Sequence, residues 1–413
     1  MKIVLADGVE VISDLVNQDN IYKKRAFERL KELRLPTKKS EEYRYFGIEN
    51  ILSRDFNLHR VEETGEIVSS QKIVIVDGVV KELPVGVEVE VGCSSTIDLE
   101  MQHFDPIYYL SHAISGDIIS LRFKKDANVT IEHRFTKPAS LLAYRVALYI
   151  DANSSVLLNE QFVGDEAKES LILNGYDIFL SRDANLELIK SQTLNRDSFM
   201  PIASHRFKLD ESSSFSWRSF DFGSSDGIEL AFASLHKRAY IKSRHLIFAK
   251  ESSKRGLVTK YNHIGEHSSS DQKAKTILQD DARGVFDALI KVEKSAKYTK
   301  AHQNSKAILL NDRAYMVSKP QLEIYIDELE ASHGSTTGQL DEKALFYLRS
   351  RGLREAEARR ILILAFANEL IDEISNEKLR DIIHQDFEIA YYGESRLECI
   401  ETCHNCEETI LGS

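Results

Sequence analysis

Cysteine and long hydrophobic runs are both scarce in this chain of 413 residues. Only four cysteines occur, at positions 93, 399, 403 and 406, which excludes a disulfide framework. The longest strongly apolar run, Ile361 to Ala367, is too short to cross a bilayer. The first residues, MKIVLADGVEV, place acids where a signal peptide needs an apolar segment. We therefore expect a cytoplasmic protein that does not associate with a membrane.

Several motifs that mark enzyme classes are also missing. No Gly-Lys dipeptide occurs, so the chain has no Walker-type phosphate loop, and neither Gly-x-Gly-x-x-Gly nor His-Glu-x-x-His is present. Paired acids such as Asp280–Asp281 and Asp327–Glu328 are more simply explained as solvated or ion-paired groups, since the chain contains 65 acidic residues. A net charge of −11 without a long Lys/Arg run argues against nucleic-acid binding. The sequence predicts no catalytic activity of its own.

Hydrophobic periodicity divides the chain into three parts. Residues 12–56 have mainly helical spacing, with Ser13 or Asp14 as the first cap, and a strand with an Asp-Gly turn follows at 72–80. From about 118 to 328, short alternating strands follow one another with almost no helical spacing. The rest of the chain returns to an amphipathic helical pattern. The order is therefore helical, then β, then helical.

A faint repeat accompanies the β region. Asp-Ala-Asn occurs at 126–128, 151–153 and 183–185, each time before a strand, and Asp-Glu-Ser at 210–212 is a looser copy. These segments begin at intervals of 25, 32 and 27 residues. Turn-and-strand units of this length indicate a solenoid, in which each coil covers its apolar face by stacking on its neighbours. We expect a right-handed parallel β-helix, with a β-sandwich as the alternative.

Two groups of residues are candidate metal ligands. His333 lies in the segment Ser332–Gly338, whose small residues suggest a flexible connection between a strand and a helix; it is either a turn residue or a ligand. The tail places Cys399, Cys403, His404 and Cys406 within eight residues, a set that suits zinc or an iron–sulfur cluster. Alternatively, the tail thiols bind no functional metal.

Long stretches of the sequence resemble one protein family. Residues 275–292, 319–353 and 357–370 resemble the C-terminal signature of the SufB/SufD family, the scaffold subunits of the SUF iron–sulfur cluster assembly machinery. At the other end, LPTKKSEEYRY (35–45) resembles a stretch typical of the SufD branch. The β region after Cys93 contains no cysteine, and the Ser-His-Gly-Ser-Thr sequence also has the SufD form.

The resemblance implies a fold that agrees with the periodicity. It implies an N-terminal, mainly helical domain, a right-handed parallel β-helix and a C-terminal helical domain. On this sequence we expect these at 1–85, 86–330 and 331–396, followed by the Cys-rich tail at 397–413. The tail is not part of the family signature.

The resemblance also implies partners and a site. It implies a complex with one SufB and two copies of the ATPase SufC, with ATP used only through SufC. His333 would lie at the SufB interface, near a SufB cysteine, where transient iron or a nascent iron–sulfur cluster is held. Many relatives have a cysteine two positions before this histidine, where this chain has Ala331. Family members can form homodimers through the β-helix when alone. The sequence does not say whether the reduced flavin associated with such complexes binds here.

The sequence leaves two alternatives open. The helices after Asp341 would dock SufC by the resemblance, but they could also cap the β-helix and shield its open edge. The chain as a whole could be a β-helix carbohydrate-active enzyme. Such enzymes are mostly exported and carry a ladder of acidic or basic residues along an outer groove, and neither feature is evident in this sequence.

Overall fold

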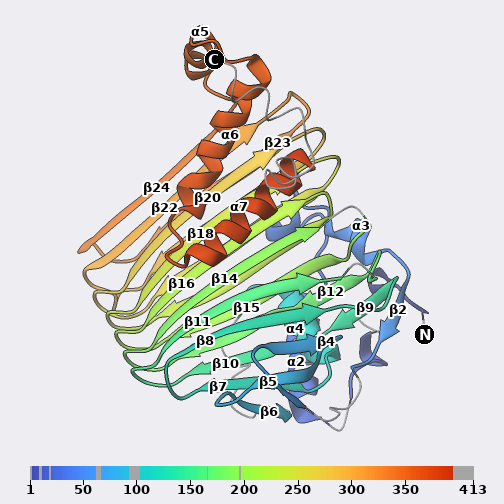
Figure 1. The fold of residues 1–413 in the computed structure, drawn as a ribbon. Helices are drawn as coiled ribbons and strands as arrows, with labels where there is room; N and C mark the ends of the chain where they lie inside the picture. Colours follow the sequence, from blue (N-terminus) through green and yellow to red (C-terminus); the bar gives the residue numbers. More distant parts are fainter. Residues whose placement is uncertain are drawn as a thin grey trace.

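The computed structural model describes residues 2–8, 12–17, 20–61, 67–92, 103–164, 166–194 and 197–393. Figure 1 shows a rod of stacked strands with helices at both ends of the chain. The predicted order of helical, β and helical parts is confirmed, and so is the parallel β-solenoid. None of the helices in these ranges is both long and apolar enough to span a bilayer.

The first part of the chain mixes short helices and strands. Its elements are β1 (Lys2–Ile3), η1 (Leu5–Asp7), α2 (Ile21–Leu33), η2 (Glu41–Tyr43), α3 (Ile48–Leu52), β2 (Phe56–His59), β3 (Val68–Ser70), β4 (Ile73–Val76), β5 (Val79–Pro84), β6 (Glu88–Gly92) and α4 (Pro106–Ile114). The expected Asp-Gly hairpin joins β4 to β5, with both turn residues at positive φ. The strands show that residues 1–85 are less helical than expected.

The solenoid occupies the middle of the chain. Its strands are β7 (Ile118–Phe123), β8 (Ala127–Arg134), β9 (Ser140–Ala143), β10 (Val146–Ile150), β11 (Ser155–Val163), β12 (Leu171–Asn174), β13 (Tyr176–Leu180), β14 (Asn185–Leu194), β15 (Met200–Leu209), β16 (Ser214–Gly223), β17 (Gly227–Leu235), β18 (Tyr240–Ala249), β19 (Lys254–His263), β20 (Ser269–Leu278), β21 (Arg283–Val292), β22 (Thr299–Leu309), β23 (Tyr315–Ile324) and β24 (Leu329–Gly338). Three helices follow: α5 (Glu342–Ser350), α6 (Glu355–Ile371) and α7 (Glu377–Tyr392).

Two parallel sheets face each other along the rod, which makes about seven turns. We call them sheet A, which carries β7, β10, β13, β15, β17, β19, β21 and β23, and sheet B, which carries β8, β11, β14, β16, β18, β20, β22 and β24. Inward positions alternate with outward ones, so equivalent residues of successive coils stack in files. One inward file of sheet B contains Trp217, Ser243, Gln272, Gln303 and His333.

The turns between the sheets share a left-handed backbone residue, which falls in two of the three Asp-Ala-Asn segments. Asn153, Asp183 and Ser212 all have φ of 58–61°, the left-handed region that Asn and Asp tolerate best. The same conformation then continues at Arg238, His267 and Tyr298, where the sequence gives no such signal. Each of these backbone N–H groups donates to a carbonyl of the next coil, at 2.7–3.3 Å; the acceptors are Arg182, Glu211, Lys237, Glu266, Lys297 and Glu328. This ladder holds residues that would otherwise avoid the conformation.

The N-terminal helices cover the outer face of sheet A. Phe27 and Leu30 of α2 and Tyr108 of α4 belong to a buried cluster that continues onto the outward residues of β15 and β17, such as Ile202. The predicted first cap was wrong: the Asn20 side chain accepts from the backbone N–H of Lys23 and begins α2. Because β6 pairs antiparallel with β7, the parallel coils of sheet A begin at β7 rather than at the expected residue 86.

The C-terminal helices α6 and α7 lie across the outer face of sheet B (Figure 1). Ile363 and Leu370 of α6 and Phe387 of α7 pack on outward residues of β16 and β18, including Phe220 and Phe248. They cover a face, not the end of the rod, because β24 remains largely exposed. The alternative in which these helices shield the open edge is therefore contradicted.

Residues 331–338 differ most from expectation. The sequence predicts them in the helical domain, with 332–338 as a flexible connection, but they form most of strand β24. The parallel pairing with β22 runs from Thr299 opposite Leu329 to Ile308 opposite Gly338. The neighbouring strand supplies the hydrogen-bond partners that impose a strand on this Gly/Ser/Thr-rich segment, whose own propensity is weak.

Candidate functional site at the open end of the solenoid

The last coil ends both sheets of the rod. Strand β23 pairs only with β21, and β24 pairs only with β22, among the strands that the structure describes. Each therefore presents one row of backbone N–H and C=O groups without a strand partner. Tyr315 and Ile324, at the two ends of β23, are 53% and 43% exposed. A long exposed edge of this kind is a template for pairing with another chain.

His333 lies in the middle of this last coil. It pairs with Gln303, so both side chains are on the inward face of sheet B. Gln303 is buried and donates from Nε2 to the carbonyl oxygen of Gln321 on β23, at 2.9 Å. His333 occupies the same file one coil further on and is exposed. Its imidazole is thus presented between the two sheets at the open end.

The neighbours of His333 on the inward face are small. Ala331 pairs with Ala301, and Ser335 pairs with Ser305. The Ser335 hydroxyl donates to Ser318 Oγ of β23 at 2.8 Å, which links the two sheets at the last coil. The position where many relatives carry a thiol is therefore on the same face as His333, two residues away, and here it holds a methyl group.

A second histidine near the edge was missed by the sequence analysis. His302 of β22 faces outward; its Nδ1 is 2.8 Å from Ser332 Oγ, and its Nε2 is 3.7 Å from a Glu330 carboxylate oxygen. Both partners belong to β24, so His302 helps to hold the last strand. Because it faces away from the interior, it does not share a site with His333. Only the strand register could have placed it, and the sequence does not supply the register.

No ready-made metal centre accompanies His333. Among the residues that the structure describes, no group of three or more His, Cys, Asp or Glu side chains could hold a metal ion. Cys399, Cys403, His404 and Cys406 lie outside the described residues, and so does Cys93. A single exposed imidazole supplies one nitrogen ligand. Any metal bound at His333 needs further ligands from another molecule or from solvent.

Two buried polar clusters were also missed, and both lie away from the last coil. In the first, Asp177 is fully buried and contacts Arg145 Nη2 at 2.9 Å, His112 Nε2 at 3.2 Å and Arg206 Nε at 3.3 Å. Burial alone would raise the pKa of Asp177, but the charges of Arg145 and Arg206 and the contact with His112 outweigh it and hold the pKa well below its usual value. This cluster ties α4 to sheet A.

The second buried cluster lies inside the rod. Lys190 Nζ donates to a carboxylate oxygen of Glu229 at 2.6 Å, and Ser219 Oγ donates to the other at 2.8 Å. Tyr176 donates to Glu160 at 2.7 Å. All five side chains are buried, so the cluster has the closed, hydrogen-bonded character of a structural core rather than an open site. Polar residues at inward strand positions were the signal that could have revealed it.

One motif was overlooked. Gly223-Ser224-Ser225-Asp226-Gly227 matches Gly-x-Ser-x-Gly, the nucleophile pattern of many hydrolases. That pattern requires a strand-to-helix turn with an exposed serine, whereas this segment joins strands β16 and β17. Ser225 is buried, and its hydroxyl donates to the carbonyl of Phe199 at 2.8 Å. The motif is therefore structural.

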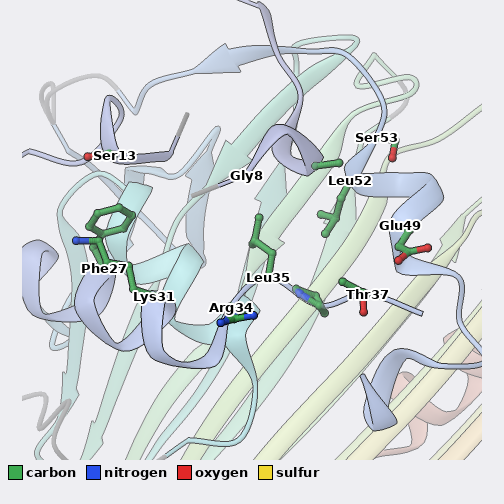
Figure 2. Close-up of a pocket in the computed structure, with 12 residues that line it drawn as sticks. Gly8, Ser13, Phe27, Lys31, Arg34, Leu35, Thr37, Glu49, Leu52 and Ser53 are labelled. Atoms are coloured by element: carbon green, nitrogen blue, oxygen red, sulfur yellow. The ribbon is translucent and has the colours of Figure 1, made fainter. Parts of the chain in front are cut away.

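Figure 2 shows a pocket of about 700 Å³ between η1, α2 and α3. Phe27, Leu35 and Leu52 provide its apolar walls, and Lys31 and Arg34 lie beside them. Lys31 is already engaged, since its Nζ is 2.8 Å from Glu28 and 4.5 Å from the centre of the Phe27 ring. No lining residue comes from β23 or β24. The pocket therefore lacks the two features that the last coil combines, an unpaired strand edge and a candidate metal ligand.

Comparison with known proteins agrees with this geometry. Residues 133–366 match the family model described as the SufBD core domain of the SUF system for FeS cluster assembly. The chain is 41% identical to the iron–sulfur cluster assembly protein SufD of Escherichia coli over 112 residues. It is 27% identical to a SufBD family protein of Synechocystis over 252 residues, and 30% identical to one of Mycobacterium leprae over 258 residues.

These matches cover only part of each relative. They span 27%, 58% and 62% of this chain, and 26%, 55% and 59% of the three relatives' own lengths. The family model covers most of the solenoid together with α5 and much of α6. The comparisons do not favour the carbohydrate-active alternative.

Proposed function

Because this chain belongs to the SufB/SufD family of SUF-system iron–sulfur cluster assembly proteins, on its SufD branch, we propose that it is a non-enzymatic scaffold subunit of a cytoplasmic SufB–SufC–SufD complex. The observation that carries the proposal is the last coil, where two unpaired strand edges flank an exposed imidazole. In this proposal, SufB pairs with the edges of β23 and β24. His333 and a SufB cysteine then face each other across the seam.

Iron and the nascent cluster are substrates of this proposed site, not resident cofactors. A neutral imidazole ligates iron well, and a seam between two subunits provides ligands from both sides. Because Ala331 has no thiol, His333 would be the ligand that this chain supplies on the inward face of β24. A site completed only on association lets the complex control when the cluster forms.

Energy for the process would come from SufC. Helix α5 buries none of its side chains, and Phe346 and Tyr347 on it are 74% and 56% exposed. Exposed aromatic side chains of this size are typical anchors of protein interfaces. We place SufC on this helix and on the adjoining part of α6. ATP would then act on this chain only through SufC, and no flavin site is assigned.

Co-expression with SufB and SufC, followed by size-exclusion chromatography with light scattering, tests the assembly. We expect a single species that contains all three proteins. The double variant Tyr315→Lys/Ile324→Lys should lose SufB, because lysines at an exposed strand edge oppose pairing with another strand. Ile21→Lys, on α2 and 72% exposed, is the matched control and should assemble normally. Failure of the unmodified chain to bind either protein would reject the proposal.

A further inference from the structure

The end of α6 is fastened to sheet B by ion pairs that the proposed function does not use. Cationic side chains lie on the outward faces of successive strands, and they contact two carboxylates, one in the last turn of α6 and one two residues after its end. The cations are Arg218 of β16, Lys242 and Arg244 of β18, and Lys273 and Lys275 of β20. The carboxylates are Glu369 and Glu373.

Glu373 contacts cationic side chains from three consecutive coils. Its carboxylate is 2.8 Å from Lys242 Nζ and 2.9 Å from Arg244 Nε, with Lys273 Nζ at 3.6 Å and Arg218 Nη1 at 3.9 Å. Burial would raise its pKa, but the hydrogen bonds from Lys242 and Arg244 outweigh burial and lower the pKa to about 2. Glu373 is therefore a fully charged anchor at neutral pH.

Lys275 contacts the C-terminal half of α6 in three ways. Its ammonium donates to the carbonyl oxygen of Phe366 at 2.7 Å, pairs with the Glu369 carboxylate and lies 4.3 Å from the centre of the Phe366 ring. The side chain is only 3% exposed. Burial lowers the pKa of Lys275, and the hydrogen bond from Lys275 lowers that of Glu369. A partly desolvated pair of this kind resists separation more than a surface pair does.

The helix before α6 packs little on the rod. Helix α5 buries none of its side chains, and a hollow of about 390 Å³ separates α5 from the end of β22, lined by Leu309, Leu345 and Phe346 among others. Helix α6 has 17 residues, so it is about 25 Å long. Helix α6 packs on sheet B along its length, is joined to it by ion pairs at its C-terminal end, and follows the exposed helix α5 at its N-terminal end.

The anchored end borders the candidate site. A depression of about 390 Å³ on the outward face of sheet B is lined by Lys275, Glu369 and His302, and His333, whose side chain faces inward, borders it from β24. Lys275 and His333 stand on β20 and β24, with β22 between them. A shift of α6 at Lys275 therefore reaches the last coil through a single intervening strand.

We propose that Lys275, Glu369 and Glu373 form a clamp that couples movement of α5 and α6 to the last two coils and so positions His333 during cluster assembly. The proposal rests on the proposed function, because it takes SufC as the source of that movement. The three side chains are positioning residues: none of them contacts iron or the cluster in this scheme. Without the clamp, SufC would still bind and hydrolyse ATP, but less of the movement of α5 and α6 would reach the last two coils.

The test uses the complex reconstituted with SufB and SufC, and it measures clusters formed per ATP hydrolysed. Glu373→Gln and Glu369→Gln should assemble and hydrolyse ATP at wild-type rates, but their yield per ATP should fall at least about fivefold. Glu28→Gln, which breaks an exposed pair with Lys31 on α2, is the matched control and should be unaffected. The charge swap Lys275→Glu/Glu369→Lys should restore much of the yield that Glu369→Lys alone loses.

The outcomes separate the two proposals. If the unmodified chain forms no complex, the proposed function is rejected, and the clamp with it. If the complex forms and the glutamine variants keep a wild-type yield per ATP, the clamp alone is rejected. Loss of complex formation or of thermal stability in Glu369→Gln, the more exposed of the two positions, would show that these ion pairs are merely structural and would also overturn the clamp.

Discussion

His333→Ala is expected to lower the rate of cluster formation by at least about tenfold while the complex with SufB and SufC still assembles. Changes around metal ligands typically cost 10–100-fold in metal affinity or activity, and His333 would be a ligand itself. The side chain is exposed in the free chain, so its removal should not reduce stability. Cluster formation is followed by absorbance in the reconstituted complex, and assembly is followed by size-exclusion chromatography.

Two further variants sharpen this prediction. His333→Cys replaces the imidazole with a thiolate, which also ligates iron, and should retain more activity than His333→Ala. His302→Ala removes a histidine from the neighbouring strand whose side chain faces outward, and it should retain most of the activity. Equal losses at both positions, or normal cluster formation in His333→Ala, would remove the inward face of the last coil from the mechanism.

Asp177→Ala is expected to reduce the free energy of unfolding by about 3–5 kcal/mol, the usual cost of removing one partner from a buried ion pair. Arg145 and Arg206 would be left as buried charges without their carboxylate, and Tyr108 would lose the acceptor that its hydroxyl contacts at 2.5 Å. The free energy is measured by urea-induced unfolding. The loss should loosen α4 from the solenoid first.

The pH dependence follows from the direction of the pKa shift. The pKa of Asp177 in the folded chain is well below its value of about 3.9 in an unfolded chain, so the stabilisation is fully present above that value. This stabilisation is lost as the pH falls from about 3.9 towards the pKa of Asp177 in the folded chain. The free energies of unfolding of the unmodified chain and of Asp177→Ala should become equal there. Asp281→Ala, which breaks an exposed pair with Arg313, is the control and should cost less than about 1 kcal/mol. A similar loss in the free energy of unfolding for Asp177→Ala and Asp281→Ala would contradict the role of Asp177 as a buried ion-pair partner.

The architecture could be predicted from the sequence because local residue patterns indicate its strands and turns. Alternating residues marked the strands, and the Asp-Ala-Asn segments marked turns where Asn153 and Asp183 take a left-handed conformation. The later turns escaped notice because Arg238, His267 and Tyr298 have no intrinsic preference for that conformation. Their conformation is imposed by hydrogen bonds to the next coil, and a single-sequence pattern does not report such bonds.

The candidate site was only partly predictable for a similar reason. The family resemblance singled out His333, but the small residues around it suggested a flexible connection, and pairing with β22 makes that segment a strand. Which face His333 occupies depends on register, because a shift by one residue would turn it outward. The sequence also could not predict the clamp, because Lys275 and Glu369 are far apart in sequence and meet only where α6 folds back over sheet B.

Backbone hydrogen exchange of β23 and β24, compared between the free chain and the complex with SufB, tests the proposed seam most directly. If SufB pairs with the open end, amides of β23 and β24 that exchange freely in the isolated chain should be protected at least tenfold in the complex, while the inner strands β16 and β18 should change little. A complex that forms without protection of either edge strand would show that SufB binds elsewhere. His333 would then not contribute to a cluster site shared with SufB.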